Sequence, residues 1–325
     1  MVSNSTTRGH VELTDLRLLA KAAELGSLAK SARALGIEKA AATRRLQRLE
    51  SALGCKLIHR QGGRFALTEE GRALLPHAQR GISALDDGFA SIMAPDAPLT
   101  GTLRVAAPHT YGRRTISPLL LAFAAKNPDL VVELKLGSER VDILADEADL
   151  AIRIGEIGSE SLVARKLAVE RFLLCASPAY ISSAPPLLTP DDLINHRIVD
   201  LRVGVARTHI ELIGKKGPRQ VRVKPSFRCN DPEMVISAAC AGLGVAVAPY
   251  SIGVEEFSDG SLVRLLPEWE VPSRDVSAVY APKRGQSRAL RAFLDHLVEA
   301  MRQGPLPGVI GLHQSTFSIP TGSDT

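Results

Sequence analysis

The chain has 325 residues, of which 45% are hydrophobic, 23% charged and 4% aromatic, a composition typical of a globular protein with two or three domains. The small aromatic fraction argues against recognition of single-stranded nucleic acid by base stacking. The formal net charge of +5 lies entirely in residues 1–93, which hold 14 Lys and Arg against 9 Asp and Glu. A basic N-terminal part on a neutral body is typical of phosphate binding.

The chain shows no redox, metal or membrane pattern. Its eight histidines are scattered, and its four cysteines lie far apart, at Cys55, Cys175, Cys229 and Cys240. We therefore expect reduced thiols, no metal and no cofactor. The first residues lack the long apolar core of a signal peptide, and no segment has the apolar length of a membrane span. These features predict a cytoplasmic protein that does not enter a membrane.

Three helices are predicted in the N-terminal third. The first covers about residues 14–25, with Thr14 as a possible N-cap. The second begins after Ser27, a good N-cap, and Gly36 ends it. The third has an apolar face at helical spacing, formed by Ala42, Leu46, Leu49 and Leu53.

The opposite side of this third helix carries small, hydroxyl and basic side chains. A helix that buries one side and presents such groups on the other suits the major groove of DNA. The alternative is a helical hairpin with a solvated basic face, but the concentration of positive charge in this part of the chain favours DNA. Arg48 stays ambiguous, because Glu38 and Glu50 are near enough in sequence to pair with it.

A hairpin and a long helix follow. Two short β-like runs, 56–59 and 64–67, flank a Gly-Gly pair and predict the hairpin. Arg60 and Arg64 bracket its tip, so it is either a wing along a phosphate backbone or a solvated turn. The long helix is predicted to begin after Thr68, a suitable N-cap.

Apolar side chains on the long helix step by four, four, three, four and three, as in a coiled-coil seam. They are Leu74, Ala78, Ile82, Leu85, Phe89 and Ile92. Such a seam either pairs two chains or packs against the protein's own body. The proline-containing residues 94–98 then indicate a linker.

Beyond the linker, predicted strands and helices alternate. Strands are expected at residues 102–108, 130–137, 150–155, 171–177 and 245–249. Helices are expected at residues 113–126, 139–147, 232–241 and 289–301. This alternation predicts a parallel α/β sheet. From residue 303 the chain lacks periodicity, so we expect a disordered tail.

Six segments of the chain together carry a family resemblance. They are ELGSLAKSARALGIEKAAATRRLQRLESALGCKLIHR, FALTEEGRALLPHA, LRVAAP, DLAIRIG, LVARKLAVERFLLCASPAYI and AGLGVAVAP. In this order and spacing, over roughly residues 12–301, they resemble the LysR-type transcriptional regulators. The resemblance implies a winged helix-turn-helix, a linker helix that pairs subunits, and a two-lobed α/β effector domain like a periplasmic binding protein. It also implies a homodimer or homotetramer on double-stranded promoter DNA.

The resemblance also implies a domain division and DNA contacts. The expected parts are a winged helix-turn-helix over residues 1–67, a linker helix and hinge over 68–98, an effector-binding domain over 99–302 and a tail over 303–325. Matched by position, the side chains expected at bases are Lys39, Ala40, Thr43 and Arg44, and those expected at phosphates are Arg60 and Arg64. The recognition helix begins Glu38-Lys39-Ala40 in place of the usual Ser-Gln-Pro, so the operator sequence does not carry over.

The effector pocket is expected at the carboxyl ends of strands and between the lobes. His109 and Thr110 follow the first strand and precede a helix, and a helix N-terminus with a hydroxyl suits a carboxylate. We therefore expect a small anionic effector there. Arg153, Arg202 and Asn230 lie at the other expected rims.

Other roles stay open for some of these residues. Asn230 also suits a helix cap, and Arg153 is close in sequence to Asp149 and Glu156 as possible partners. Pro108 stands where the family commonly has a serine, which removes one ligand donor.

No enzyme is predicted. The segment AGLGVA lacks the third glycine of a dinucleotide fingerprint, and Ser177 and Ser251 lie in no nucleophile-elbow pattern. A small-molecule binding protein without a DNA role is the alternative, but it would need a secretion signal and would leave the basic N-terminal part unexplained. The sequence favours a ligand-responsive regulator that binds promoter DNA.

Overall fold

The computed structural model describes residues 11–61, 64–93, 97–137, 143, 148–158, 161–202, 208–282, 287–302 and 309–311, with the backbone alone described at 60, 61, 64, 87, 90–93 and 309–311. Contacts divide the chain into two compact units, Met1–Ala97 and Pro98–Thr325. Each unit has its own hydrophobic core.

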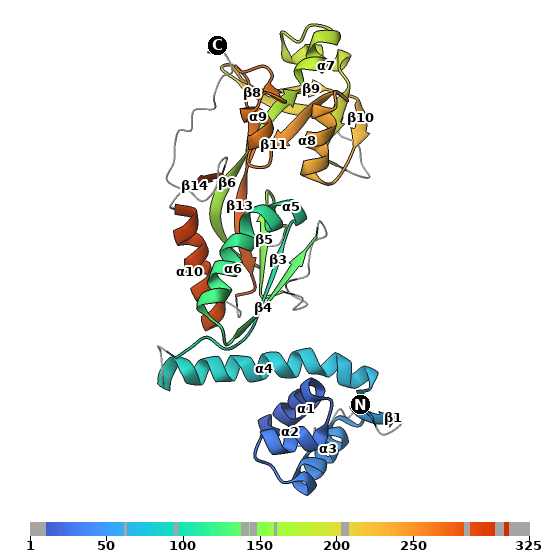
Figure 1. Ribbon diagram of the computed structural model, residues 1–325, viewed down its shortest axis with the longest axis vertical. Helices are drawn as coiled ribbons and strands as arrows, with labels where there is room; N and C mark the ends of the chain where they lie inside the picture. The colour runs from blue at the N-terminus through green and yellow to red at the C-terminus, as the bar shows by residue number, and fades with distance from the viewer. Residues whose placement is uncertain are drawn as a thin grey trace, which may run out of the picture. The chain divides into compact units, whose positions relative to one another are not determined.

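The first unit consists, in its described residues, of four helices and a hairpin (Figure 1). Its elements are α1 (Leu13–Leu25), α2 (Leu28–Ala34), α3 (Lys39–Leu53), β1 (Ile58–Gln61), β2 (Arg64–Leu67) and α4 (Glu69–Met93). The helices pack around buried leucines, which are Leu18, Leu19, Leu46, Leu49 and Leu57. The predicted helices and the antiparallel hairpin are confirmed, although β1 begins two residues later than predicted.

Side-chain caps explain where these helices begin. The Ser27 hydroxyl accepts a hydrogen bond from a backbone N–H at 3.3 Å, and the Thr68 hydroxyl accepts one at 3.0 Å, so both predicted caps are confirmed. Thr14 is not a cap, because α1 begins one residue earlier than it. The N-cap is Glu12, whose N–H donates to the carboxylate of Asp15 at 3.3 Å.

The apolar seam of α4 divides into two parts. Leu74 packs against the core of the first unit and Ala78 is buried, so this end of the seam covers the protein's own body. Leu85 and Phe89, by contrast, are 46% and 56% exposed. The side chain of Ile92 lies outside the described residues. The exposed end of the seam therefore lies outside the core of the first unit.

Ten strands form one sheet in the described part of the second unit. Its main strands lie in the order β10 (Pro225–Arg228), β7 (Ile198–Asp200), β11 (Val245–Pro249), β6 (Val163–Ala176), β13 (Val271–Tyr280), β5 (Leu150–Ile154), β3 (Gly101–Ala107) and β4 (Leu130–Leu136). The strands β12 (Val263–Arg264) and β14 (Val309–Gly311) also pair with β6. A separate hairpin contains β8 (His209–Gly214) and β9 (Gly217–Arg222).

Two long strands, β6 and β13, connect two lobes of this unit (Figure 1). β13 is antiparallel to β5 in the first lobe, β6 is antiparallel to β11 in the second, and β6 and β13 are antiparallel to each other. Within the lobes, β3 is parallel to β4 and β5, and β7 is parallel to β10 and β11. A wholly parallel sheet was therefore the wrong prediction, because one long strand leaves the first lobe and another returns to it.

Helices cover the sheet in both lobes. The first lobe contains α5 (His109–Tyr111), a π-helical turn (Gly112–Ile116), α6 (Ser117–Lys126) and α10 (Arg288–Arg302). The second contains α7 (Pro178–Ser183), a 3-10 helix (Pro190–Asn195), α8 (Pro232–Cys240) and α9 (Val254–Ser258). The helical segment after β3 begins at His109, earlier than the predicted residue 113.

Gly112 permits this early start. A Cβ atom there would lie 2.5 Å from Leu136 Cδ2 and 2.8 Å from the Cβ of Ala107. The π-helical turn can therefore lie against β3 and β4 only where the residue has no side chain. This close approach places His109 and Thr110 at the end of β3.

Two predicted features fall largely outside the described residues. The helix at 139–147 is described only at Ile143, which is buried. In the tail 303–325, predicted to be disordered, the structure describes only Val309–Gly311. This short part forms β14, with Val309 opposite Glu170 of β6, so it is a strand.

Candidate functional site

The exposed side of α3 carries the four side chains predicted to face bases. Lys39, Ala40 and Arg44 are exposed, and Thr43 is half-buried with its hydroxyl donating to the carbonyl oxygen of Lys39 at 3.1 Å. Gly36, at a φ of 65°, makes the tight turn that leads into this helix. The other face of α3 packs in the leucine core, so the structure presents these four side chains on one surface.

Arg48 packs α3 against α1. Its guanidinium lies 2.8 Å from a carboxylate oxygen of Asp15, which is fully buried, and Arg45 lies 3.3 Å from the same carboxylate. The hydrogen bond to Asp15 raises the pKa of Arg48. Arg48 thus pairs with α1, and not with Glu38 or Glu50, the partners that its own neighbourhood in the sequence offers.

The hairpin places the two predicted wing residues beside its tip. Arg60 of β1 lies opposite Phe65, and Arg64 of β2 lies opposite Gln61. The tip itself and the side chains of both arginines lie outside the described residues. Their contact with phosphates stays a prediction.

A cleft cavity of about 240 Å³ lies between the lobes of the second unit. It brings together His109 and Thr110 from α5 and Asn230 from the loop before α8, three of the five residues predicted for the effector. Arg202 lies in an adjoining cavity. Arg153, on β5, lines neither of these two cavities.

The Thr110 hydroxyl binds a carboxylate of the protein itself. It donates to Asp231 Oδ2 at 2.8 Å across the two lobes. The other carboxylate oxygen accepts the Met234 N–H at 3.0 Å, so Asp231, and not Asn230, caps α8. Burial acts to raise the pKa of Asp231, but these hydrogen bonds outweigh it and the pKa is lowered. This arrangement disfavours the predicted carboxylate site at Thr110, since Asp231 would repel a second carboxylate.

Further contacts join the lobes nearby. Arg114 Nε lies 3.0 Å from Glu233 in the first turn of α8, and its Nη1 donates to the carbonyl oxygen of Ile252 at 2.8 Å. Arg113 pairs with the same Glu233 carboxylate. The present arrangement of the lobes is therefore held by polar contacts along one edge of the cleft.

Tyr111 and Glu170 are among the ionisable residues inside the cleft that sequence reasoning missed. The Tyr111 hydroxyl is buried and has no hydrogen-bond partner among the described residues. Burial and, second, the charge of Glu170 raise the pKa of Tyr111. Burial also raises the pKa of Glu170 to about 7, although the Ser251 hydroxyl donates to its carboxylate at 2.7 Å. A single glutamate within the apolar run LAVERFLLCA was the available signal.

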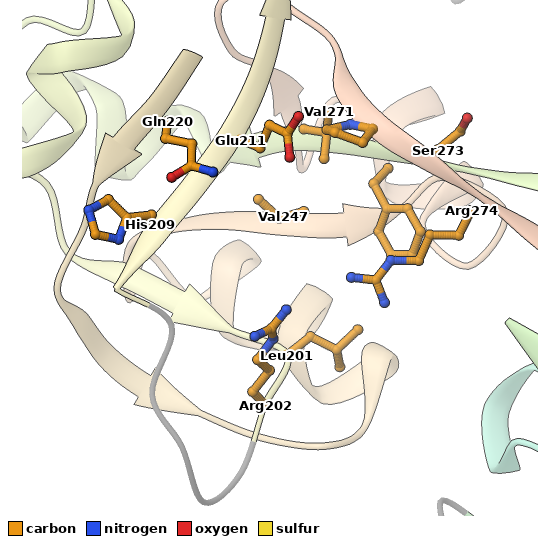
Figure 2. A pocket seen from close by; sticks show the side chains of 11 residues that line it. Leu201, Arg202, His209, Glu211, Gln220, Val247, Val271, Ser273 and Arg274 are labelled. Atoms are coloured by element: carbon orange, nitrogen blue, oxygen red, sulfur yellow. The ribbon is translucent and has the colours of Figure 1, made fainter. Parts of the chain in front are cut away.

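An adjoining cavity of about 350 Å³ lies within the second lobe (Figure 2). Its polar lining comes from the loop after β7, from the β8–β9 hairpin and from the start of β13, and includes Arg202, His209, Glu211, Gln220 and Arg274. Phe172, Leu201 and Arg274 line both this cavity and the cleft. The two cavities therefore meet at these three side chains.

Neither a metal-binding cluster nor a membrane-spanning helix occurs in the described part of the chain. No group of three or more His, Cys, Asp and Glu side chains there could hold a metal ion. None of the helices described is both long enough and apolar enough to cross a membrane.

Comparison with known families decides the class of protein. Residues 13–72 match the family described as "Bacterial regulatory helix-turn-helix protein, lysR family". Residues 96–302, more than half of the chain, match the "LysR substrate binding domain". The chain belongs to the LysR family of transcriptional regulators.

Individual relatives of this LysR-type regulator agree with that conclusion. An HTH-type transcriptional regulator of Xanthomonas campestris pv. campestris is 34% identical over 291 residues, 88% of this chain and 85% of that protein. PtxR, an HTH-type transcriptional regulator of Pseudomonas aeruginosa, is 31% identical over 297 residues, 91% of this chain and 95% of that protein. The full-length structure of the Vibrio cholerae virulence activator AphB is similar with a TM-score of 0.55 and 29% identity, covering 89% of this chain and 99% of that one.

The predicted class of function is thereby confirmed. The LysR-type regulator has an N-terminal helix-turn-helix and a C-terminal effector-binding domain, and regulators of this family bind promoter DNA and small-molecule effectors. It is a transcriptional regulator and not an enzyme.

Proposed function

We propose that this LysR-type regulator reads promoter bases with the exposed side of α3 and holds the DNA backbone with its hairpin. The residues assigned to DNA are Lys39, Ala40, Thr43, Arg44, Arg60 and Arg64. The support is the solvent-facing position of the α3 side chains, in the part of the chain that holds all of the net positive charge. Titration of a labelled fragment from upstream of its own gene, at several salt concentrations, tests this assignment. Specific binding should be nanomolar and should weaken with salt.

The effector site in this proposal is the cleft between the two lobes. The observation that carries it is the buried Tyr111 hydroxyl, which lines the cavity and has no hydrogen-bond partner among the described residues. Buried polar groups are normally paired, so a ligand that fills this cavity gains a hydrogen bond there. His109, Thr110 and Asn230 line the same cavity.

Removal of the Tyr111 hydroxyl tests whether the effector binds in the cleft. The concentration of metabolite that produces a half-maximal change in promoter affinity is measured across a metabolite library for the unaltered chain. For any active compound, Tyr111→Phe should raise this concentration, because only the unpaired hydroxyl is removed. Tyr280→Phe is the matched control, since Tyr280 is half-buried at the end of β13 and lines neither cavity. An equal response in both variants would move the effector site elsewhere.

The regulator acts, in this proposal, as a cytoplasmic homodimer or homotetramer. Leu85 and Phe89 leave an apolar strip exposed on α4, and pairing two such strips would remove it from water. Two chains joined in this way carry two reading helices for two half-sites. The effector would then act by preferring one arrangement of the oligomer, with a coupling of about 1–3 kcal/mol between ligand and DNA.

A further inference from the structure

Two arginine side chains face one cavity in the second lobe. Arg202 follows β7 and Arg274 lies on β13, and Figure 2 shows both guanidinium groups pointing into the same space. In the part of the chain that the structure describes, neither guanidinium has a carboxylate within ion-pair distance. Two like charges at one cavity are unfavourable unless an anion lies between them.

The other charged groups near this cavity do not neutralise the two positive charges. Loss of hydration and, second, the charge of Arg202 lower the pKa of Arg274, while the charge of Glu156 acts in the opposite direction. Glu211 and His209 line the other side of the cavity, on β8. Arg202 and Arg274 therefore repel each other despite the carboxylates nearby.

Arg274 also connects this cavity with the cleft. Its guanidinium lies 5.1 Å from the centre of the Phe172 ring, and Arg274, Phe172 and Leu201 line both spaces. The carboxyl groups of Glu170 and Asp231 also line the cleft, and Glu170 lies opposite Arg274 in the pairing of β6 with β13. Neither of these two carboxyl groups lines the cavity that holds both arginines, and an acidic ligand group is attracted to the two guanidinium groups there.

We propose that Arg202 and Arg274 bind the acidic group of the effector, a carboxylate or a phosphate, while its apolar body extends past Phe172 toward the Tyr111 hydroxyl. This inference rests on the proposed role of the cleft as the effector site. Guanidinium groups bind both oxyanions through paired hydrogen bonds, and Phe172 and Leu201 give both cavities an apolar wall. The effector is therefore an amphipathic organic acid with a hydrogen-bonding group at its far end.

Calorimetry on the full-length protein tests the arginine pair with simple probes. The acids are benzoate, hexanoate and phenyl phosphate, and their uncharged counterparts are benzamide, hexanamide and phenol. We expect at least one acid to bind the unaltered chain about tenfold or more tightly than its counterpart, and Arg202→Gln or Arg274→Gln to remove that advantage. Arg165→Gln should leave it unchanged, because Arg165 pairs with Asp295 in the first lobe, outside both cavities.

The outcomes distinguish a failure of the anion subsite, formed by Arg202 and Arg274, from a failure of the cleft as the effector site. Failure of every acid to bind the unaltered chain, or equal binding by the unaltered chain and both arginine variants, overturns the anion subsite. If the uncharged compounds bind and Tyr111→Phe weakens them while the arginine variants do not, the cleft survives and only the anion subsite is overturned. Preference for benzoate and hexanoate identifies a carboxylic acid, and preference for phenyl phosphate identifies a phosphate ester.

Discussion

The hydroxyl of Thr110 donates to the carboxylate of Asp231 over 2.8 Å and so joins the first turn of α5 to the N-terminus of α8 on the opposite lobe. Beside it, Arg114 lies 3.0 Å from Glu233 and also binds the carbonyl oxygen of Ile252. A ligand that rotates or separates the lobes must break or rearrange these contacts. They therefore set part of the free energy that differential effector binding has to supply.

Removing the hydrogen bond between Thr110 and Asp231 should lower the stability of the second unit. Thr110→Val keeps the shape of the side chain, and we expect the free energy of unfolding to fall by about 1–3 kcal/mol, because a carboxylate loses a donor. Asp231→Ala should cost more, since it also removes the cap that accepts the Met234 N–H. Chemical denaturation of the full chain measures both. An unchanged stability in Thr110→Val, or a larger loss in Thr110→Val than in Asp231→Ala, would contradict a stabilising role for this hydrogen bond.

Arg44→Ala tests the reading surface of α3. Because Arg44 is exposed, the fold should be retained, and the affinity for the specific promoter should fall by about 1–3 kcal/mol. Fluorescence polarisation with a promoter fragment at fixed salt measures this. Lys21→Ala is the matched control, because Lys21 pairs with Glu24 on α1 at 2.8 Å. Equal losses of promoter affinity in the two variants would mean that Arg44 contributes only general electrostatic attraction to DNA.

Arg64→Ala tests the hairpin as a wing. Arg64 begins β2 beside the tip, where the sequence predicts a phosphate contact. The variant should bind specific and unrelated DNA more weakly by similar factors, and the slope of log affinity against log salt should become shallower by about one. A slope equal to that of the unaltered chain would favour the solvated-turn alternative.

The first unit was largely predictable because its signals are local. The Ser27 cap, the turn at Gly36 and the buried spacing of Leu46 and Leu49 all act within one or two helical turns. The partner of Arg48 was not predictable in this way. It is a buried carboxylate on α1, and only the packing of α1 against α3 brings the two together.

The second unit was predicted less well where distant segments meet. The strand positions were recognisable, but the antiparallel passage of β6 and β13 depends on pairing between remote parts of the chain. Thr110 and Asp231 are 121 residues apart, so no local pattern could show that one binds the other. Arg274 was missed for the same reason, because its proposed role depends on Phe172 and Arg202, which line the same cavity from distant parts of the chain.

The exposed end of α4 predicts how the chain assembles. Leu85→Lys together with Phe89→Lys should split the oligomer, because the paired seam would then bury charge. Neither residue is buried in the structure, so folding of the first unit should be retained. Light scattering measures the mass, and circular dichroism checks the helices. An unchanged mass in the folded double variant would favour packing of this helix against the protein's own body alone.

Glu170 makes the stability of the second unit depend on pH. Burial raises its pKa from the usual 4.5 to about 7, against the hydrogen bonds from Ser251. Between these values the folded chain retains a proton that the unfolded chain has lost. The free energy of unfolding therefore falls as the pH rises through this range and levels off above the folded pKa. The total fall from this group is about 3 kcal/mol.

Glu170→Gln removes this titration while keeping a side chain of similar size. The stability of the variant minus that of the unaltered chain should grow as the pH rises from about 4.5 to about 7, and should then stay constant. Chemical denaturation at a series of pH values measures the difference. Asp295→Asn is the control, because the Asp295 side chain is 72% exposed, and it should show no such rise. A difference for Glu170→Gln that is independent of pH would contradict a buried, protonated carboxyl in the cleft.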